Sequence, residues 1–149
     1  MKILAIDYGE KRIGLALGDT ESKIALPLKT IKNLGYEFVV QNIRNIIAEW
    51  EINKIILGIP EIFHDQEINK KIQNFGDILK KSLNIEIIFY NEDFSSNYAS
   101  ADLNRQMQVG RKKKINKEEI DRIAATIILQ SYFENEILKR ADTGNTSKN

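Results

Sequence analysis

Two acidic residues follow apolar runs that are predicted to form β-strands. Asp7 comes directly after the apolar residues 3–6, and Glu92 lies just beyond a second such run at 85–90. A carboxylate at the end of an apolar row is costly unless it is paired, ligated or at the rim of the sheet. Because ligands bind outside the carboxyl ends of parallel strands in open α/β sheets, we expect both acids to open on one crevice.

A third acid, Asp121, is predicted to come from a helix. It shares one helical face with the small and apolar side chains of Ala124, Ala125 and Ile128, which predicts close packing on the sheet. Three convergent carboxylates offer the oxygen ligands that suit Mg²⁺ or Mn²⁺. Two such ions about 4 Å apart can activate a water molecule for in-line displacement at a phosphodiester.

The composition excludes several other chemistries. The 149 residues include no cysteine and one histidine, His64, which rules out a thiol nucleophile, a cysteine-ligated metal and a histidine-rich site. The net charge is only +1, so affinity for nucleic acid would need a local basic patch. No apolar run reaches the roughly 18 residues of a membrane span, and no signal-peptide pattern is present, which predicts a soluble cytoplasmic protein with no membrane partner.

A local basic patch occurs between residues 105 and 117, which include six lysine or arginine residues and no acid. It directly precedes the predicted helix of Asp121, where it could hold a phosphate backbone with salt-dependent affinity. A solvated loop is the alternative interpretation. The hairpin after Asp7 is expected to extend the same rim, and Ser95 could cap a helix or touch a phosphate. The predicted nucleic-acid-binding residues are Lys11, Arg12, Ser95, Arg111, Lys112, Lys113 and Lys114.

Hydrophobic periodicity predicts the elements that position these residues. Strands are expected at 3–8, 12–18, 25–31, 54–59 and 85–90, and Pro27 favours an edge position for the third strand. Helices are expected from Gly35 to Trp50, over 68–83 and from Asn116 to about Leu138, with a short helix after Ser95. These elements predict one α/β domain over residues 1–138 and a flexible tail over 139–149.

Four stretches in order resemble the YqgF family of bacterial proteins. They are residues 7–16 (DYGEKRIGLA), 56–60 (ILGIP), 91–96 (NEDFSS) and 121–132 (DRIAATIILQSY). The likeness extends from about Lys2 to about Glu134, and the first and last stretches are the most specific. Two positions depart from the family pattern, which has Asp in place of Asn91 and Arg in place of Asp93.

The resemblance implies an RNase H-like fold, in which helices flank a mixed five-stranded sheet of order 3-2-1-4-5 with strand 2 antiparallel. It implies that Asp7, Glu92 and Asp121 are catalytic residues that ligate Mg²⁺ or Mn²⁺ for phosphodiester hydrolysis. The implied role is 5′-end maturation of 16S rRNA, with pre-rRNA and a ribosomal precursor particle as partners.

Three alternatives stay open. A Holliday-junction-type resolvase would use the same acids on branched DNA, and the sequence does not distinguish a monomer from a homodimer. A non-catalytic RNA-binding factor could keep the fold, given the changes at Asn91 and Asp93. A phosphotransferase of the actin and sugar-kinase type is a third alternative, because its phosphate-binding start resembles Asp7-Tyr8-Gly9, although such proteins need two such domains to enclose ATP.

Overall fold

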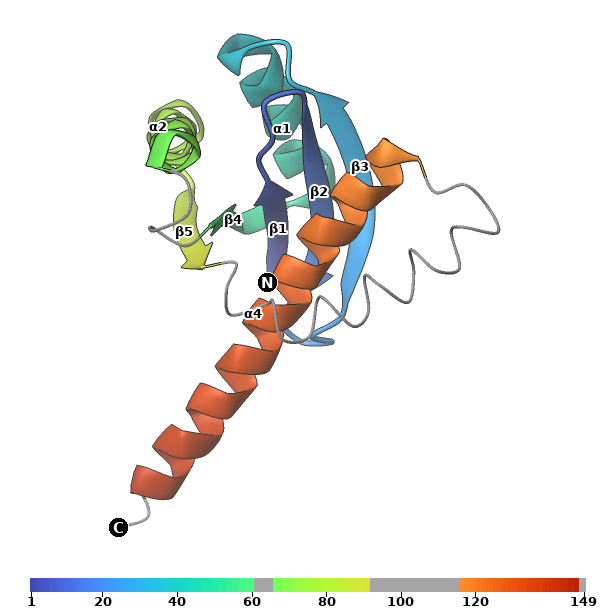
Figure 1. The fold of residues 1–149 in the computed structure, drawn as a ribbon. Coiled ribbons are helices and arrows are strands. Elements are labelled where there is room, and N and C mark those ends of the chain that lie inside the picture. Colours follow the sequence, from blue (N-terminus) through green and yellow to red (C-terminus); the bar gives the residue numbers. More distant parts are fainter. Residues whose placement is uncertain (61–65, 92–115, 148–149) are drawn as a thin grey trace.

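A computed structural model of the chain describes residues 1–60, 66–91 and 116–147 (Figure 1). Its strands are β1 (Lys2–Asp7), β2 (Arg12–Asp19), β3 (Ala25–Lys32), β4 (Ile52–Ile59) and β5 (Glu86–Asn91). Its helices are α1 (Tyr36–Trp50), α2 (Gln66–Leu83) and α4 (Lys117–Ser147). Each of these strands and helices was predicted from the sequence. The short helix expected after Ser95 lies outside the described residues.

The strands form one mixed sheet of five strands in the order β3-β2-β1-β4-β5, as predicted. Strand β2 pairs antiparallel with both β1 and β3, whereas β4 pairs parallel with β1 and β5. The parallel pairing brings the carboxyl ends of β1, β4 and β5 to one edge of the sheet. Strand β3 is one of the two outermost strands of the sheet; its Pro27 faces solvent, and the ladder between β2 and β3 shifts register between Leu15 and Ala16.

Helices cover both faces of the sheet. Helices α1 and α2 pack on one face against the alternate residues Leu4 and Ile6 of β1. Helix α4 crosses the other face, against Ile3 and Ala5 of the same strand, and Figure 1 shows it running diagonally over β1, β2 and β3. Residues 3–6 of β1 are all apolar because both faces of the strand are buried there.

Helix α4 ends later than the sequence predicts. The expected end was near Leu138, where the apolar periodicity stops, but the helix continues to Ser147. Figure 1 shows its last turns projecting beyond the sheet, so these turns form without the sheet beneath them. Apolar periodicity reports contact with a core, and it therefore marks where packing ends, not where the helix ends. Among the described residues, no helix combines the length and apolar character needed to cross a membrane.

Candidate active site

Asp7 is the last residue of β1 and continues the row of Ile3 and Ala5 on the α4 face of the sheet. Its antiparallel partner on β2 is Gly14. On the other side, Leu57 of β4 pairs with Ile6 and is followed by Gly58. Asp7 therefore has a glycine beside it on each of the two neighbouring strands, Gly14 on β2 and Gly58 on β4.

Asp121 comes from the first turns of α4, which begin at a capped N-terminus. The side-chain Oδ1 of Asn116 accepts a hydrogen bond from the backbone N–H of Glu119 at 2.9 Å, as the predicted capping box requires. The hydroxyl of Thr30 on β3 donates to the carbonyl of Glu118 at 2.6 Å. These contacts fix the start of α4 to the sheet and set the position of Asp121.

Gly14 brings Asp121 next to Asp7. A Cβ at position 14 would lie 2.0 Å from the backbone oxygen of Asp121, so only glycine permits this approach of helix to strand. Gly14 is also the partner of Asp7, and paired residues of antiparallel strands have their Cα atoms only about 4.5–5.5 Å apart. Asp7 and Asp121 are therefore neighbours on the α4 face, although they are 114 positions apart in the sequence.

Arg12 binds Asp121 directly. Its Nε–H donates to Oδ2 of Asp121 at 2.7 Å, and the two side chains are 29% and 21% exposed. This is a short, charge-assisted hydrogen bond in a partly buried position. The sequence predicted a phosphate contact for Arg12 and a metal contact for Asp121, and it did not predict that the two side chains pair with each other.

The hairpin between Asp7 and Arg12 is anchored on both sides. Asn33 donates from its backbone N–H to the carbonyl of Lys11 and from Nδ2 to the carbonyl of Gly9, each at 2.9 Å. Lys71 of α2 donates to Glu10 at 2.8 Å, and this hydrogen bond is the main reason that the pKa of Lys71 is raised. Asn33 follows an edge strand without any recognisable motif, so sequence analysis had no signal for its role.

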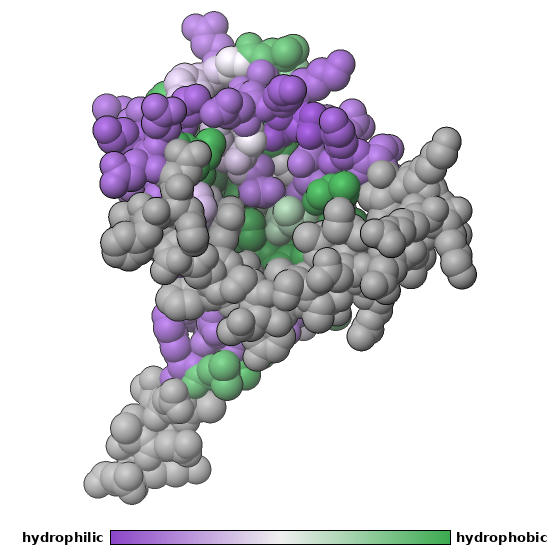
Figure 2. Space-filling model, in the orientation of Figure 1, coloured by the Kyte–Doolittle hydropathy of each residue, from purple (hydrophilic) through white to green (hydrophobic). Residues whose placement is uncertain are grey.

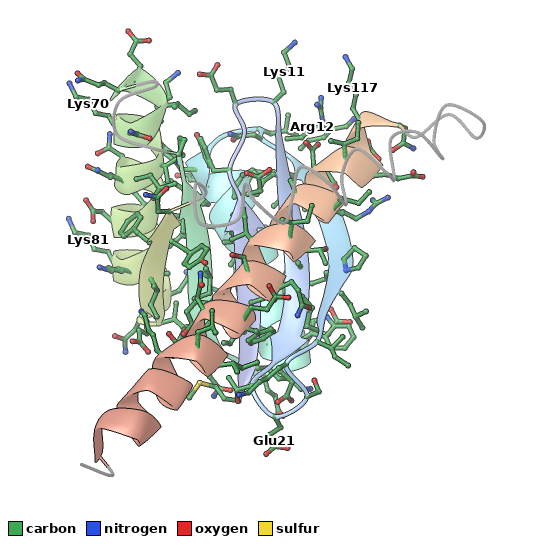
Figure 3. The ribbon with its side chains drawn as sticks, turned by 60° about the horizontal axis from the view of Figure 1, so that its bottom comes forward. Lys11, Arg12, Glu21, Lys70, Lys81 and Lys117 are labelled. Atoms are coloured by element: carbon green, nitrogen blue, oxygen red, sulfur yellow. The ribbon has the colours of Figure 1, made fainter. Side chains whose placement is uncertain are left out.

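Cationic side chains gather at this end of the molecule. Figure 3 shows Lys11, Arg12 and Lys117 together, where the hairpin meets the first turn of α4, with Glu21 at the opposite end. Figure 2 shows hydrophilic residues over the same end and apolar side chains nearer the middle of that face. Lys11 is exposed, so its charge is accessible to a ligand at the rim.

The other predicted site residues lie outside the part of the chain that the structure describes. They are Glu92, Ser95, Arg111, Lys112, Lys113 and Lys114. His64 and Asp93, which were not predicted as site residues, also lie outside the described part of the chain. Asn91 is among the described residues. It ends β5, as Asp7 ends β1, so both lie at the carboxyl ends of the parallel strands. Within the described ranges, no three Asp, Glu, His or Cys side chains come together as a metal site. The structure thus brings together two of the three predicted acids, and the third stays a prediction.

Comparison with known proteins gives the family. The sequence profile described as "RuvX: Holliday junction resolvase" matches residues 1–135. A relative from Mycoplasma mobile, described as "Putative pre-16S rRNA nuclease", is 35% identical over 143 residues, which cover 93% of this chain and 96% of the relative. A second relative with the same description, from Caldanaerobacter subterraneus, is 32% identical and is covered to 98%. The match therefore extends over nearly the whole length of both relatives.

Solved structures show the same fold at low sequence identity. The RuvC protein of Thermus thermophilus, solved in complex with a Holliday junction substrate, has a TM-score of 0.63 at 14% identity, covering 92% of this chain and 96% of RuvC. The fowlpox virus resolvase has a TM-score of 0.57 at 19% identity, covering 91% and 98%. The sheet order and helix arrangement are thus those of a RuvC-like RNase H fold. With the profile matched over residues 1–135 and relatives above 30% identity along the whole domain, the chain belongs to the RuvX/YqgF family of nucleases.

Proposed function

We propose that this protein is a nuclease that uses Mg²⁺ or Mn²⁺ to hydrolyse phosphodiester bonds in the 5′-end maturation of 16S rRNA. The observation that carries the proposal is the juxtaposition of Asp7 and Asp121, which Gly14 makes possible. Two acidic residues from unconnected elements lie close together in the backbone at the carboxyl ends of the parallel strands, where α/β sheets bind their ligands.

The donor set fits a hard divalent cation. Asp7 and Asp121 supply carboxylate oxygens, the ligands that Mg²⁺ and Mn²⁺ prefer. Glu92 is proposed as the third ligand, since it immediately follows the last residue of β5 at the same edge of the sheet. A cation held there would neutralise charge on the phosphate and lower the pKa of a bound water molecule.

The side chains of the hairpin would bind and orient the substrate. Lys11 and Arg12 lie at the rim, and Lys117 lies beside them at the start of α4 (Figure 3). A phosphate backbone laid over this rim would meet their ammonium and guanidinium groups and be held close to the two carboxylates. Such contacts recognise the backbone without reading the base sequence. Arg111, Lys112, Lys113, Lys114 and Ser95 are proposed to extend this contact.

RNA is the favoured substrate because the full-length relatives at 32–35% identity are described by their action on pre-16S rRNA. The family profile carries the description of a Holliday junction resolvase, which makes branched DNA the second candidate. The structural likeness to resolvases, at 14–19% identity, supports the fold and does not favour either substrate. Both substrates therefore belong in the first experiment.

The test compares the cleavage of two substrates by the purified protein. One is single-stranded RNA containing a precursor 16S 5′ end, and the other is a four-way DNA junction, each with Mn²⁺ or with EDTA. We expect Mn²⁺-dependent cleavage of the RNA, and we expect Asp7→Asn to slow it about 100-fold or more, because metal-assisted stabilisation amounts to several kcal/mol. Asp77→Asn is the matched control, since Asp77 is an exposed residue on α2, away from the site.

The alternative outcomes are distinct. Preferential cutting of the junction would replace the rRNA role by a resolvase role while keeping the site. A folded protein that binds RNA but cuts neither substrate would contradict the nuclease proposal and indicate a non-catalytic RNA-binding factor. In that case the departures at Asn91 and Asp93 would be the first positions to revert to the family residues.

A further inference from the structure

The Arg12–Asp121 pair places a fixed cation on a carboxylate that the proposed function assigns to a divalent ion. The Nε–H donates to Oδ2 at 2.7 Å, and 109 positions separate the two residues in the sequence. Arg12 is the first residue of β2, directly after the anchored hairpin, so its backbone position is set by the sheet. The pair is therefore a defined feature of the site and not a chance contact between mobile surface side chains.

Asp121 cannot avoid this guanidinium by a shift of its helix. A Cβ on residue 14 would lie 2.0 Å from its backbone oxygen, and the hydroxyl of Thr30 on β3 donates to the carbonyl of Glu118, so the start of α4 is held against the sheet. A divalent ion that shares the Asp121 carboxylate with Arg12 would meet a like charge within a few ångströms, which is unfavourable. The two cations therefore compete for Asp121, and the side chain of Arg12 is the part that can move.

Phosphate offers Arg12 an alternative partner. The guanidinium carries several N–H donors in a planar fork whose geometry suits phosphate as well as carboxylate. Arg12 is also at the rim with Lys11, where a backbone phosphate would arrive (Figure 3). A phosphate at this position could accept the hydrogen bonds of Arg12 while Asp121 turns to a metal ion. The negative charges stay compensated in this exchange, because the phosphate is paired with Arg12 and the Asp121 carboxylate is paired with the metal ion.

We propose that Arg12 is a positioning residue that occupies the Asp121 carboxylate in the free protein and transfers to a substrate phosphate when nucleic acid binds. Asp121 is then available to a divalent cation chiefly when substrate is present. This inference rests on the proposed nuclease function and adds a regulation to it, since loading of the metal is coupled to binding of the substrate. The coupling must be reciprocal, so metal should also strengthen substrate binding.

Metal binding without nucleic acid tests the inference directly. Mn²⁺ affinity is measured by isothermal titration calorimetry and by the Mn²⁺ electron paramagnetic resonance signal for wild type, Arg12→Gln and the neighbouring control Lys11→Gln. We expect Arg12→Gln to bind Mn²⁺ about fivefold more tightly, the effect of removing one partly exposed competing ion pair. Lys11→Gln should change the affinity by less than about twofold, because a more exposed charge is screened by solvent.

RNA binding in EDTA should change in the opposite direction. We expect Arg12→Gln to bind single-stranded RNA about fivefold more weakly than wild type, because a phosphate contact is lost. Opposite shifts in the two affinities distinguish exchange from damage to the site, since a misfolded site would not gain affinity for Mn²⁺. Arg12→Lys is a second variant that keeps the charge without the Nε–H, and its Mn²⁺ affinity should lie between those of wild type and Arg12→Gln.

Unchanged or weaker Mn²⁺ binding by both Arg12 variants would overturn the inference. An equal gain in Arg12→Gln and Lys11→Gln would also overturn it, because the cause would then be the general field of the rim. Failure of the proposed function has a different signature: Asp7→Asn would leave Mn²⁺ binding unchanged, and the wild type would cut no substrate. The two failures can therefore be told apart in the same set of proteins.

Discussion

Tyr90 links β5 to α4 through its hydroxyl group. The hydroxyl lies 2.8 Å from Oγ of Ser131, a buried side chain, and it accepts a hydrogen bond from Nδ2 of Asn135. The ring of Tyr90 also contacts that of Tyr132 edge to face, with the ring centroids 5.9 Å apart. Since Tyr90 is paired with Gly58, this connection ties the middle of α4 to the part of the sheet formed by β4 and β5.

Removal of that hydroxyl should cost stability. We expect Tyr90→Phe to lower the free energy of unfolding by about 1–2 kcal/mol, because it removes the hydrogen bonds of the hydroxyl with the buried Ser131 and the half-buried Asn135. Urea unfolding of Tyr90→Phe, Ser131→Ala and the double variant would measure this. The double variant should lose less than the sum of the single variants by about 1 kcal/mol. Additive losses would show that the two side chains do not act through a shared hydrogen bond.

At the residue scale, the sequence predicts on which elements Asp7 and Asp121 lie better than it predicts their partners. Asp7 and Asp121 are identifiable because each departs from a regular apolar pattern in a strand or a helix. The pairing of Asp121 with Arg12 is not, since 109 positions separate them and each has a separate reason to be near a ligand. Asn33 is missed for the same reason, because its hydrogen bonds to the hairpin are long-range contacts without a local signature.

At the scale of elements, the packing of α4 depends on small residues along β2. Gly14, Ala16 and Gly18 alternate on the face that meets the helix, and Ala125 is fully buried from the helix side. A Cβ on Gly18 would meet side-chain atoms of Phe133 and Leu129 at 2.7 and 2.8 Å. The helix therefore lies very close to the strand. A Cβ on Gly14 would meet backbone atoms of α4, whereas a Cβ on Gly18 would meet side-chain atoms.

This difference predicts unequal effects of two matched substitutions. Gly14→Ala would collide with backbone and should cost about 3 kcal/mol, displace Asp121 and reduce cleavage at least tenfold. Gly18→Ala meets side chains that can change rotamer, so it should cost about 1–2 kcal/mol and leave cleavage within about twofold. Urea unfolding and initial cleavage rates measure both effects. A larger loss of activity in Gly18→Ala would contradict the role assigned to Gly14.

The alternation of β2 is visible in the sequence, and it predicts the strand and its two faces correctly. It does not reveal that a glycine on the small-residue face is required by the backbone of a helix that begins more than a hundred residues later. The boundaries of the elements likewise differ in how accurately the sequence predicts them. Strands buried by packing are predicted to within two residues, whereas α4 extends beyond its predicted end because its last turns project past the sheet.

At the scale of the whole molecule, the end of α4 is expected to be dispensable for folding. Ile137 and Leu138 are already 45% and 58% exposed, and Figure 1 shows the helix continuing away from the sheet. A stop codon after Lys139 should therefore change Tm by less than about 3 °C, equivalent to under 1 kcal/mol, and leave RNA cleavage unchanged. A fall of more than about 6 °C would show that residues 140–149 stabilise the domain.

The distribution of charge predicts how the molecule meets its substrate. With a net charge of +1, attraction to nucleic acid cannot come from the protein as a whole and must come from one region. Figure 3 shows Lys11, Arg12 and Lys117 at the end that carries the proposed site, whereas Lys81 lies away from them on α2. The affinity for single-stranded RNA in EDTA should therefore fall steeply as salt is added, because bound phosphates release counterions.

The salt dependence identifies which cations contact phosphate. Lys11→Ala and Lys117→Ala should each weaken RNA binding and reduce the slope of log Kd against log salt by about one, as expected for one lost phosphate contact. Lys81→Ala removes the same charge from the other region and should leave the slope unchanged. Fluorescence anisotropy of a labelled RNA between 50 and 200 mM salt, a range over which such contacts weaken strongly, gives the slopes. An equal reduction by Lys81→Ala would place the binding surface elsewhere and separate it from Asp7 and Asp121, because a phosphate held near Lys81 would not reach the two carboxylates.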